Sequence, residues 1–259
     1  MQTKLRSVVV SGIAAIVLAG CASSGGGGAK NAWSTADLST ALSAPARPQD
    51  DRSRDADRKP ADLMVFFGVE RGMTALDLIA SGGYMTEVLA TAVGPTGKVY
   101  AQNPPAFLKF NNGAYDKAMG TRLAGNRLPN VVRVDADLPA AALVPPGSVD
   151  VAVTALNLHD MYNRDKAAAT KFLKDVHSML KPGGVFGVID HVGVAGADNQ
   201  KLHRMQKADA IAAAKEAGFT VEAESNLLAH TADDHTKGPF DPALRGKTDQ
   251  FILKLRKAK

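Results

Sequence analysis

The chain has 259 residues, of which 45% are hydrophobic and 22% are charged, and its formal net charge at pH 7 is +5. This excess is small, and basic residues alternate with acids, as in DDRSRDADRK (residues 50–59), which is typical of a solvated helix face. We therefore expect no nucleic-acid partner. Because Cys21 is the only cysteine, an internal disulfide and a cysteine-based metal site or nucleophile are excluded.

The amino terminus has the pattern of an export signal. Two basic residues precede an apolar run at residues 8–18 that is too short to span a bilayer stably. Residues 18–21, LAGC, resemble a bacterial lipobox, in which the cysteine is lipidated and becomes the first residue of the mature protein. An ordinary signal peptide or an uncleaved anchor is the alternative. We predict a signal peptide at residues 1–20, a lipid on Cys21 and a periplasm-facing cell-envelope lipoprotein, and Ala22 favours the outer membrane.

The remaining chain divides into a tether and one domain. Residues 21–47 contain a serine and glycine run and predict a flexible tether, whereas residues 48–259 are long enough for a single domain with a substantial core. Strands are predicted at residues 74–79, 98–102, 131–134, 149–156, 185–189, 220–224 and 250–255. Helices are predicted at residues 48–59, 60–67, 84–93, within 106–123, and at 166–180 and 201–217. This alternation indicates an α/β fold, a Rossmann-like, mostly parallel seven-stranded sheet with helices on both faces.

One stretch, residues 75–90 (ALDLIASGGYMTEVLA), combines a short apolar strand, an acid, a small-residue turn and a helix. Such a turn presents free backbone N–H groups at a helix N-terminus, which suits a nucleotide-type ligand. The stretch resembles motif I of class I S-adenosylmethionine (SAM) dependent methyltransferases, and its second half is similar to the form in protein isoaspartyl methyltransferases. Ile79 and Ser81 stand where the first two glycines of that motif would be.

Three further stretches resemble the same family in the same order. They are VDAD (residues 134–137), the region 145–160 and the region 172–190, which contains a Lys-Pro-Gly-Gly turn. The tail and residues 51–61 are similar to a group of exported bacterial proteins called predicted methyltransferases. The resemblance implies the class I methyltransferase fold, SAM as cofactor and a small-molecule substrate.

In open parallel sheets, ligands bind at the carboxyl ends of the strands near the switch in strand order. The resemblance then places Asp77 near the amino acid part of SAM, and the acid that normally ends the second strand is replaced by Gln102 and Asn103. An amide accepts a ribose hydrogen bond without a charge, so altered cofactor binding is expected. Arg52, Arg54 and Arg58 are candidates for the SAM carboxylate, and Asp135 or Asp137 for the adenine amino group. The expected cofactor-binding residues are Asp77, Ser81, Gly82, Gly83, Tyr84, Gln102, Asn103, Asp135, Asp137 and Asn157.

Methyl transfer from a sulfonium needs an aligned nucleophile and sometimes a base. The catalytic candidates are His159 and Asp160 after the fourth strand and His191 after the fifth, with a structural role for each histidine as the alternative. The tail cluster of His230, Asp233, Asp234 and His235 does not have a recognised metal-ligand spacing. We predict a polar loop there and no metal site.

Two other functions remain open. SAM is made in the cytoplasm, whereas a lipidated chain faces away from it, and the motif I departures weaken cofactor binding. These points favour a catalytically degenerate methyltransferase scaffold that acts as an envelope binding protein. A hydrolase or metal-dependent enzyme that uses His159, His191 and His235 is the third possibility.

Overall fold

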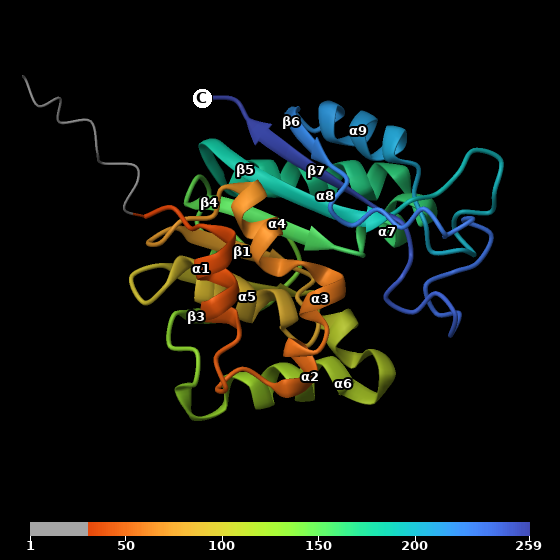
Figure 1. The fold of residues 1–259 in the computed structure, drawn as a ribbon. Helices are drawn as coiled ribbons and strands as arrows, with labels where there is room; N and C mark the ends of the chain where they lie inside the picture. The colour runs from red at the N-terminus through yellow and green to blue at the C-terminus, as the bar shows by residue number, and fades with distance from the viewer. Residues whose placement is uncertain (1–30) are drawn as a thin grey trace, which may run out of the picture. The chain divides into compact units, whose positions relative to one another are not determined.

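Seven strands form one sheet in the order β3-β2-β1-β4-β5-β7-β6 (Figure 1). The computed structural model describes residues 31–259, so the expected signal peptide and the lipidation site Cys21 lie outside the described residues. β7 is antiparallel to both of its neighbours, and the other strand pairs are parallel. The strands are β1 Thr74–Leu78, β2 Lys98–Asn103, β3 Val131–Asp135, β4 Val149–Ala155, β5 Leu180–His191, β6 Phe219–Ser225 and β7 Gln250–Lys257. This sheet confirms the predicted one.

The burial of each strand follows its place in the sheet. β4 lies between β1 and β5, and five of its seven residues are buried, because helices cover both faces there. β6 lies at an edge, and its alternation of more buried and exposed residues is typical of a strand with one solvated face. The apolar run and the alternating pattern in the sequence therefore correspond to central and edge strands.

Helices pack on both faces of the sheet (Figure 1). α1, α4 and α5 share one apolar cluster with the strands, whereas α7, α8 and α9 share another. The helices are α1 Thr35–Leu42, α2 Gln49–Arg52, α3 Asp55–Arg58, α4 Pro60–Phe67, α5 Tyr84–Val93, α6 Pro105–Leu123, the 3-10 turn η1 Ala124–Asn126, α7 Leu158–Arg164, α8 Lys166–Met179 and α9 Lys207–Glu216. Within residues 31–259, no helix is long and apolar enough to cross a membrane.

Helix α8 shows how local sequence sets these elements. Asp165 caps its N-terminus by accepting hydrogen bonds from two backbone N–H groups of the first turn. Ala169, Leu173 and Val176 recur at helical spacing and are fully buried against the sheet. The cap and the apolar stripe together explain why the predicted helix forms where it does.

The folded unit begins before the expected boundary at residue 48. α1 packs on α4 and α5 through the buried side chains of Leu38 and Leu42. Trp33 Nε1 also donates a hydrogen bond of 2.7 Å to the carbonyl of Ala92 in α5. Residues 31–47, which the sequence analysis placed in the tether, therefore contribute to the domain, because a short apolar stripe in an alanine- and serine-rich segment is hard to distinguish from a linker.

Other elements differ from the predictions in extent. The helix expected at residues 48–59 is two single turns, α2 and α3, and the Lys-Pro-Gly-Gly turn at residues 181–184 belongs to β5. α9 begins at Lys207 instead of residue 201, and α7 was not predicted. These segments lack a repeating apolar pattern, so tertiary contacts decide their conformation.

Candidate functional site

The turn between β1 and α5 keeps the backbone of a glycine-rich loop although two of its expected glycines are absent. Ile79 and Ser81 both have φ of 53°, and Gly83 has φ of 86°. The left-handed region is rare for a residue with a side chain, and a β-branched residue there is an outlier. The fold therefore retains a strained conformation at the carboxyl end of β1, as functional sites often do.

The last two residues of β2 hold this turn in place. Asn103 Oδ1 accepts a hydrogen bond of 2.8 Å from the backbone N–H of Ser81, and Gln102 Oε1 accepts one of 3.2 Å from that of Ile79. Gln102 Nε2 also donates to the carbonyl of Ala136 at 2.8 Å. Both amide side chains are almost completely buried. The ribose contacts expected of Gln102 and Asn103 thus give way to a structural role, because the turn folds down onto their amide groups.

Asp77 is buried beneath the same turn. Its Oδ2 accepts a hydrogen bond of 2.5 Å from the Thr86 hydroxyl in α5. Burial raises the pKa of Asp77 from its ordinary value of 3.8 to about 7, and the hydrogen bonds from Thr86 and the charge of Arg122 only partly oppose this. Asp77 therefore links β1 to α5, and its carboxyl titrates near neutral pH.

Arginine side chains cover Tyr84, the first residue of α5. The guanidinium carbons of Arg54 and Arg58 lie 4.7 Å and 4.6 Å from the centre of its ring, and its hydroxyl donates a hydrogen bond of 2.7 Å to Asp55. Arg54 forms an ion pair with Asp51. Among the described residues, Arg58 has no hydrogen-bond or ion-pair partner, and burial followed by the charge of Arg54 lowers its pKa. An anion beside Arg58 would relieve this unpaired charge.

A third arginine, Arg122 of α6, bonds directly to the turn. Its Nε donates a hydrogen bond of 2.7 Å to the carbonyl of Gly82. Its Nη1 forms an ion pair of 2.6 Å with Asp51 and another with Glu87 in α5. A Cβ atom on Gly83 would lie 2.7 Å from the Arg122 side chain. Gly83 is therefore required for two reasons: its φ is positive, and a side chain there would collide with Arg122.

The other expected cofactor-binding residues, of which the two aspartates were expected near adenine, lie in a different setting. Asp135 ends β3, is exposed and forms an ion pair of 2.8 Å with Arg133. Asp137 is also exposed, in a connection from β3 to β4 that contains no helix. Asn157 precedes α7 and donates a hydrogen bond of 2.7 Å to the carbonyl of Ala155. The structure thus leaves the two aspartates accessible but gives neither a buried pocket.

At the carboxyl ends of β4 and β5, a buried carboxylate orients a histidine. Asp190 Oδ1 lies 2.6 Å from His159 Nδ1, and Asp190 Oδ2 accepts a hydrogen bond of 2.8 Å from the His159 backbone N–H. Burial alone would lower the pKa of His159, but the carboxylates of Asp190 and Asp160 outweigh it and the pKa is raised. The bond to Nδ1 leaves Nε2 as the nitrogen available for chemistry.

His191 is in a less reactive setting than His159. It is 5% exposed, and its Nδ1 lies 2.8 Å from the hydroxyl of Thr248. Burial lowers the pKa of His191 to about 4, so its ring is neutral at pH 7. The structure therefore places His191 behind the site as a packing and hydrogen-bonding residue.

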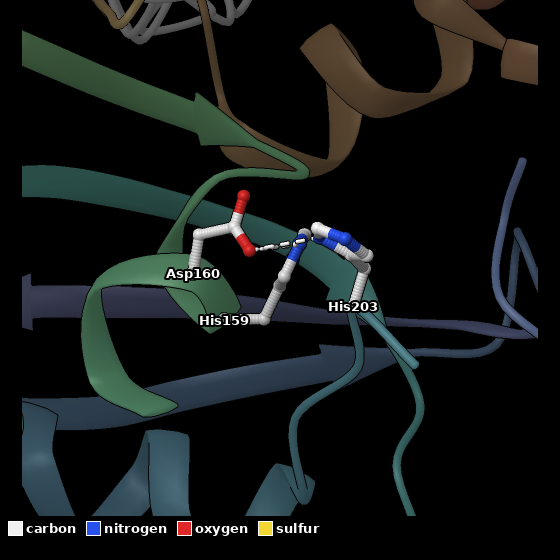
Figure 2. Close-up of side chains that lie close together, drawn as sticks. All are labelled: His159, Asp160 and His203. Carbon is white, nitrogen blue, oxygen red and sulfur yellow. Dashed lines mark hydrogen bonds and ion pairs between the residues drawn. The ribbon is translucent and has the colours of Figure 1, made fainter. Parts of the chain in front are cut away.

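His203, which the sequence analysis did not single out, joins His159 and Asp160 at the site (Figure 2). Its Nδ1 lies 2.9 Å from Asp160 Oδ1, and the same oxygen lies 3.5 Å from His159 Nε2. His203 comes from the loop between β5 and α9, 43 residues from Asp160 in the chain. No spacing rule could have paired residues this far apart.

The polar tail cluster connects the tail loop to the loop between β5 and α9. Arg204 and Asp233 are both fully buried at their side chains and form a two-oxygen ion pair of 2.9 Å and 2.8 Å. His235 Nε2 lies 3.1 Å from Asp249, and within residues 31–259 Asp234 accepts side-chain hydrogen bonds only from Thr236. The side chain of His230 has no hydrogen bond or ion pair among the described residues. This agrees with the prediction of a polar loop.

The chain is similar to curated methyltransferases over part of its length. It is 32% identical over 124 residues to the ubiquinone/menaquinone biosynthesis C-methyltransferase UbiE of Escherichia coli O1:K1, a match that covers 48% of this chain and 44% of the relative. The chain thus matches less than half the length of that relative. No model of a known protein family matches the chain.

Solved structures resemble most of the chain. A SAM-dependent methyltransferase from Aquifex aeolicus has a TM-score of 0.56 at 20% identity and covers 86% of this chain and 98% of its own. The fold is that of the class I SAM-dependent methyltransferases. A Burkholderia thailandensis 1,6-didemethyltoxoflavin-N1-methyltransferase, solved with S-adenosylhomocysteine, has a TM-score of 0.53 at 19% identity and covers 81% of this chain and 80% of its own.

The class I methyltransferase fold divides the site into two halves. The ends of β1 and β2 carry the strained turn, Asp77 and the arginine cover, whereas the ends of β4 and β5 carry His159, Asp160 and Asp190. The strand order reverses between these halves, and ligands of open α/β sheets bind at this point. The predicted site residues thus lie along one edge of the sheet. Of the three candidate arginines, Arg58 is the one without a polar partner among the described residues, and His203 and Arg122 are the additions that the tertiary structure makes.

Proposed function

We propose that the protein transfers a methyl group from SAM to a small-molecule acceptor. The observation that carries this proposal is the strained, left-handed turn between β1 and α5 at the switch point of a class I methyltransferase sheet. Two relatives of known name support it, since UbiE is a C-methyltransferase and the Burkholderia enzyme was solved with S-adenosylhomocysteine. When bound, SAM would supply an electrophilic methyl group on a sulfonium.

The donor half would hold the methionine part of SAM. Ser81, Gly82 and Gly83 keep the backbone close to the ligand. Arg58 of α3 offers a half-buried guanidinium over Tyr84, the first residue of α5, and has no polar partner among the described residues. A guanidinium beside a helix N-terminus suits a carboxylate. Asn103 fits the ribose less well than an acid, because both of its side-chain polar atoms contact Ser81. We therefore expect most of the affinity for SAM to come from contacts with its carboxylate.

The acceptor half would bind the substrate between β4 and β5. Asn157, His159 and Asp160 lie at this edge, and Asp190 fixes the orientation of the His159 ring. The transfer needs the acceptor atom aligned with the methyl group, so positioning by these residues accounts for most of the rate enhancement. His191 supports the site from behind and has no contact with the acceptor in this proposal.

Calorimetry with SAM and S-adenosylhomocysteine tests the donor half. We expect Arg58→Gln to weaken binding of both ligands at least tenfold, because it removes the cation beside the carboxylate. Arg71→Gln is the matched control, since Arg71 lies over Trp33 before the amino end of β1, away from the turn, and should leave affinity unchanged. Absence of heat from the unsubstituted protein at millimolar ligand would overturn the proposal.

We also propose that the protein is an exported lipoprotein anchored in the outer membrane and facing the periplasm. The support is the basic, apolar and LAGC pattern of residues 1–21. Labelled palmitate should enter the protein in growing cells, and Cys21→Ser should abolish the label. Equal labelling of the two proteins would contradict this.

A second candidate is an envelope protein that keeps the fold and binds a ligand without catalysis. The observation that favours it is Asn103, whose amide replaces the expected acid and is fully buried against Ser81. Labelled SAM with an extract of small molecules separates the two functions, because only the enzyme produces a labelled product. A methylated product that depends on Asp160 would exclude this candidate.

A further inference from the structure

The side chains of His159, Asp160 and His203 converge at the carboxyl edge of the sheet (Figure 2). One ligand atom from each lies within 4.8 Å of the others. Asp160 Oδ1 is 2.9 Å from His203 Nδ1 and 3.5 Å from His159 Nε2. An ion about 2.1 Å from each ligand separates neighbouring ligand atoms by about 3.0 to 3.4 Å. The two measured separations lie within about 0.1 Å of the ends of this range.

We propose that these three residues bind one divalent transition-metal ion. Two imidazole nitrogens and one carboxylate oxygen form a ligand set that suits zinc, iron, cobalt or manganese and leaves coordination positions open. The sequence predicted no metal site. The third ligand, His203, comes from a distant loop and was not among the predicted site residues. The ligand set also differs from the tail cluster, in which Asp233 and His235 already have partners.

A second carboxylate supports the first ligand. Asp190 holds His159 through both Nδ1 and the backbone N–H, so Nε2 points to the shared space with Asp160. Metal-binding histidines commonly have such a partner on the other ring nitrogen, which orients the ring and increases its basicity. The two aspartates also provide negative charge around a cation.

The third ligand is held by the fold as well. Arg204, the residue after His203, donates to the carbonyl of Val192 at 2.9 Å and pairs with Asp233. Asn163 of α7 donates a hydrogen bond of 2.7 Å to the Arg204 carbonyl. The helix that carries His159 and Asp160 is thus tied directly to the loop that carries His203, which holds the three ligands together before an ion binds.

Two of the three side chains of the cluster are accessible to solvent. The side chain of His159 is 4% exposed, whereas those of Asp160 and His203 are 48% and 36% exposed. An ion can therefore enter from solvent, and an anionic oxygen or sulfur ligand could complete its coordination. Identifying that ligand with the methyl acceptor rests on the proposed function, whereas binding of the ion does not.

Titration of the chelator-treated full chain with Co²⁺ tests the proposal through the visible absorption of bound cobalt. We expect one equivalent to bind, and His203→Ala and Asp160→Asn each to weaken binding at least tenfold. Asp190→Asn should weaken it about ten- to 100-fold, as loss of an outer partner does. His177→Gln is the control, because His177 lies at the end of α8, at the opposite edge of the sheet, and should not change binding.

Two results would overturn the proposal. One is the absence of saturable cobalt absorption in the unsubstituted protein. The other is equal cobalt affinity of the His203→Ala and His177→Gln variants, which would make the cluster a set of hydrogen bonds only. Circular dichroism establishes that each variant is folded, and if His203→Ala unfolds, Asp160→Asn decides the outcome. SAM binding to the metal-free protein is measured separately, so failure of the metal site and failure of the proposed function are distinguishable.

Discussion

Removal of the Asp233 carboxylate is expected to destabilise the protein severely. Arg204 donates to both oxygens of Asp233, to the carbonyl of Val192 and twice to that of Lys237, and its side chain has no exposed surface. A guanidinium cannot shed its proton, so Asp233→Ala leaves a buried, unpaired charge. Breaking a buried ion pair in this way costs about 3 to 5 kcal/mol, out of a typical stability of about 5 to 15 kcal/mol.

Asp233 also accepts hydrogen bonds from two backbone N–H groups. The donors are His235, at 2.9 Å, and Asp249, at 2.7 Å. A buried donor left without a partner adds about 1 to 3 kcal/mol to the loss. The substitution therefore releases the tail loop and the loop that carries His203 together, and we expect cobalt binding to fall with the free energy of unfolding.

Urea denaturation followed by circular dichroism measures this effect. Asp234→Ala is the matched control, because the Asp234 side chain is exposed and bonds only to Thr236, and it should barely change the midpoint. In the double variant Arg204→Met, Asp233→Leu, no unpaired charge remains, so its loss should be clearly smaller than the sum of the single losses. A loss below about 1 kcal/mol for Asp233→Ala, or additive single and double losses, would refute the reasoning.

Three further predictions concern the turn after β1. Burial raises the pKa of Asp77 from 3.8 to about 7. The protonated carboxyl therefore contributes stability that is fully present below pH 3.8 and is lost as pH rises through about 7. The difference of about 3 between the two pKa values corresponds to at most about 4 kcal/mol. Urea midpoints between pH 4.5 and 8 should fall with pH, and Asp77→Asn should flatten this slope. Gly83→Ala should cost about 1 to 3 kcal/mol, because φ is 86° and the new Cβ meets Arg122; an unchanged melting temperature would contradict it. Asn103→Leu should cost about 1 to 3 kcal/mol by leaving the Ser81 N–H unpaired, and hydrogen exchange at Ser81 should accelerate; unaltered exchange would argue against the bond.

The sequence determined the fold to a large extent. Alternating strands and helices, the nearly continuous apolar run of β4 and the turn at Ser81-Gly82-Gly83 each follow from local pattern, and the sheet confirms them. These features are readable because backbone geometry and burial act on neighbouring residues with a fixed period. His159 and Asp160 were also found this way, since they directly follow a predicted central strand.

The tertiary structure alone decided which partners these residues have. Asn103 contacts the turn backbone, where the sequence predicted a contact with the ribose, and His203 reaches Asp160 because Arg204 and Asn163 fix its loop. Both outcomes depend on contacts between segments far apart in the chain. A polar side chain can bond to many different groups, so its partner depends on which segment the fold brings near. Periodicity and spacing in the sequence do not indicate which partner a side chain has, because packing and charge in three dimensions determine it.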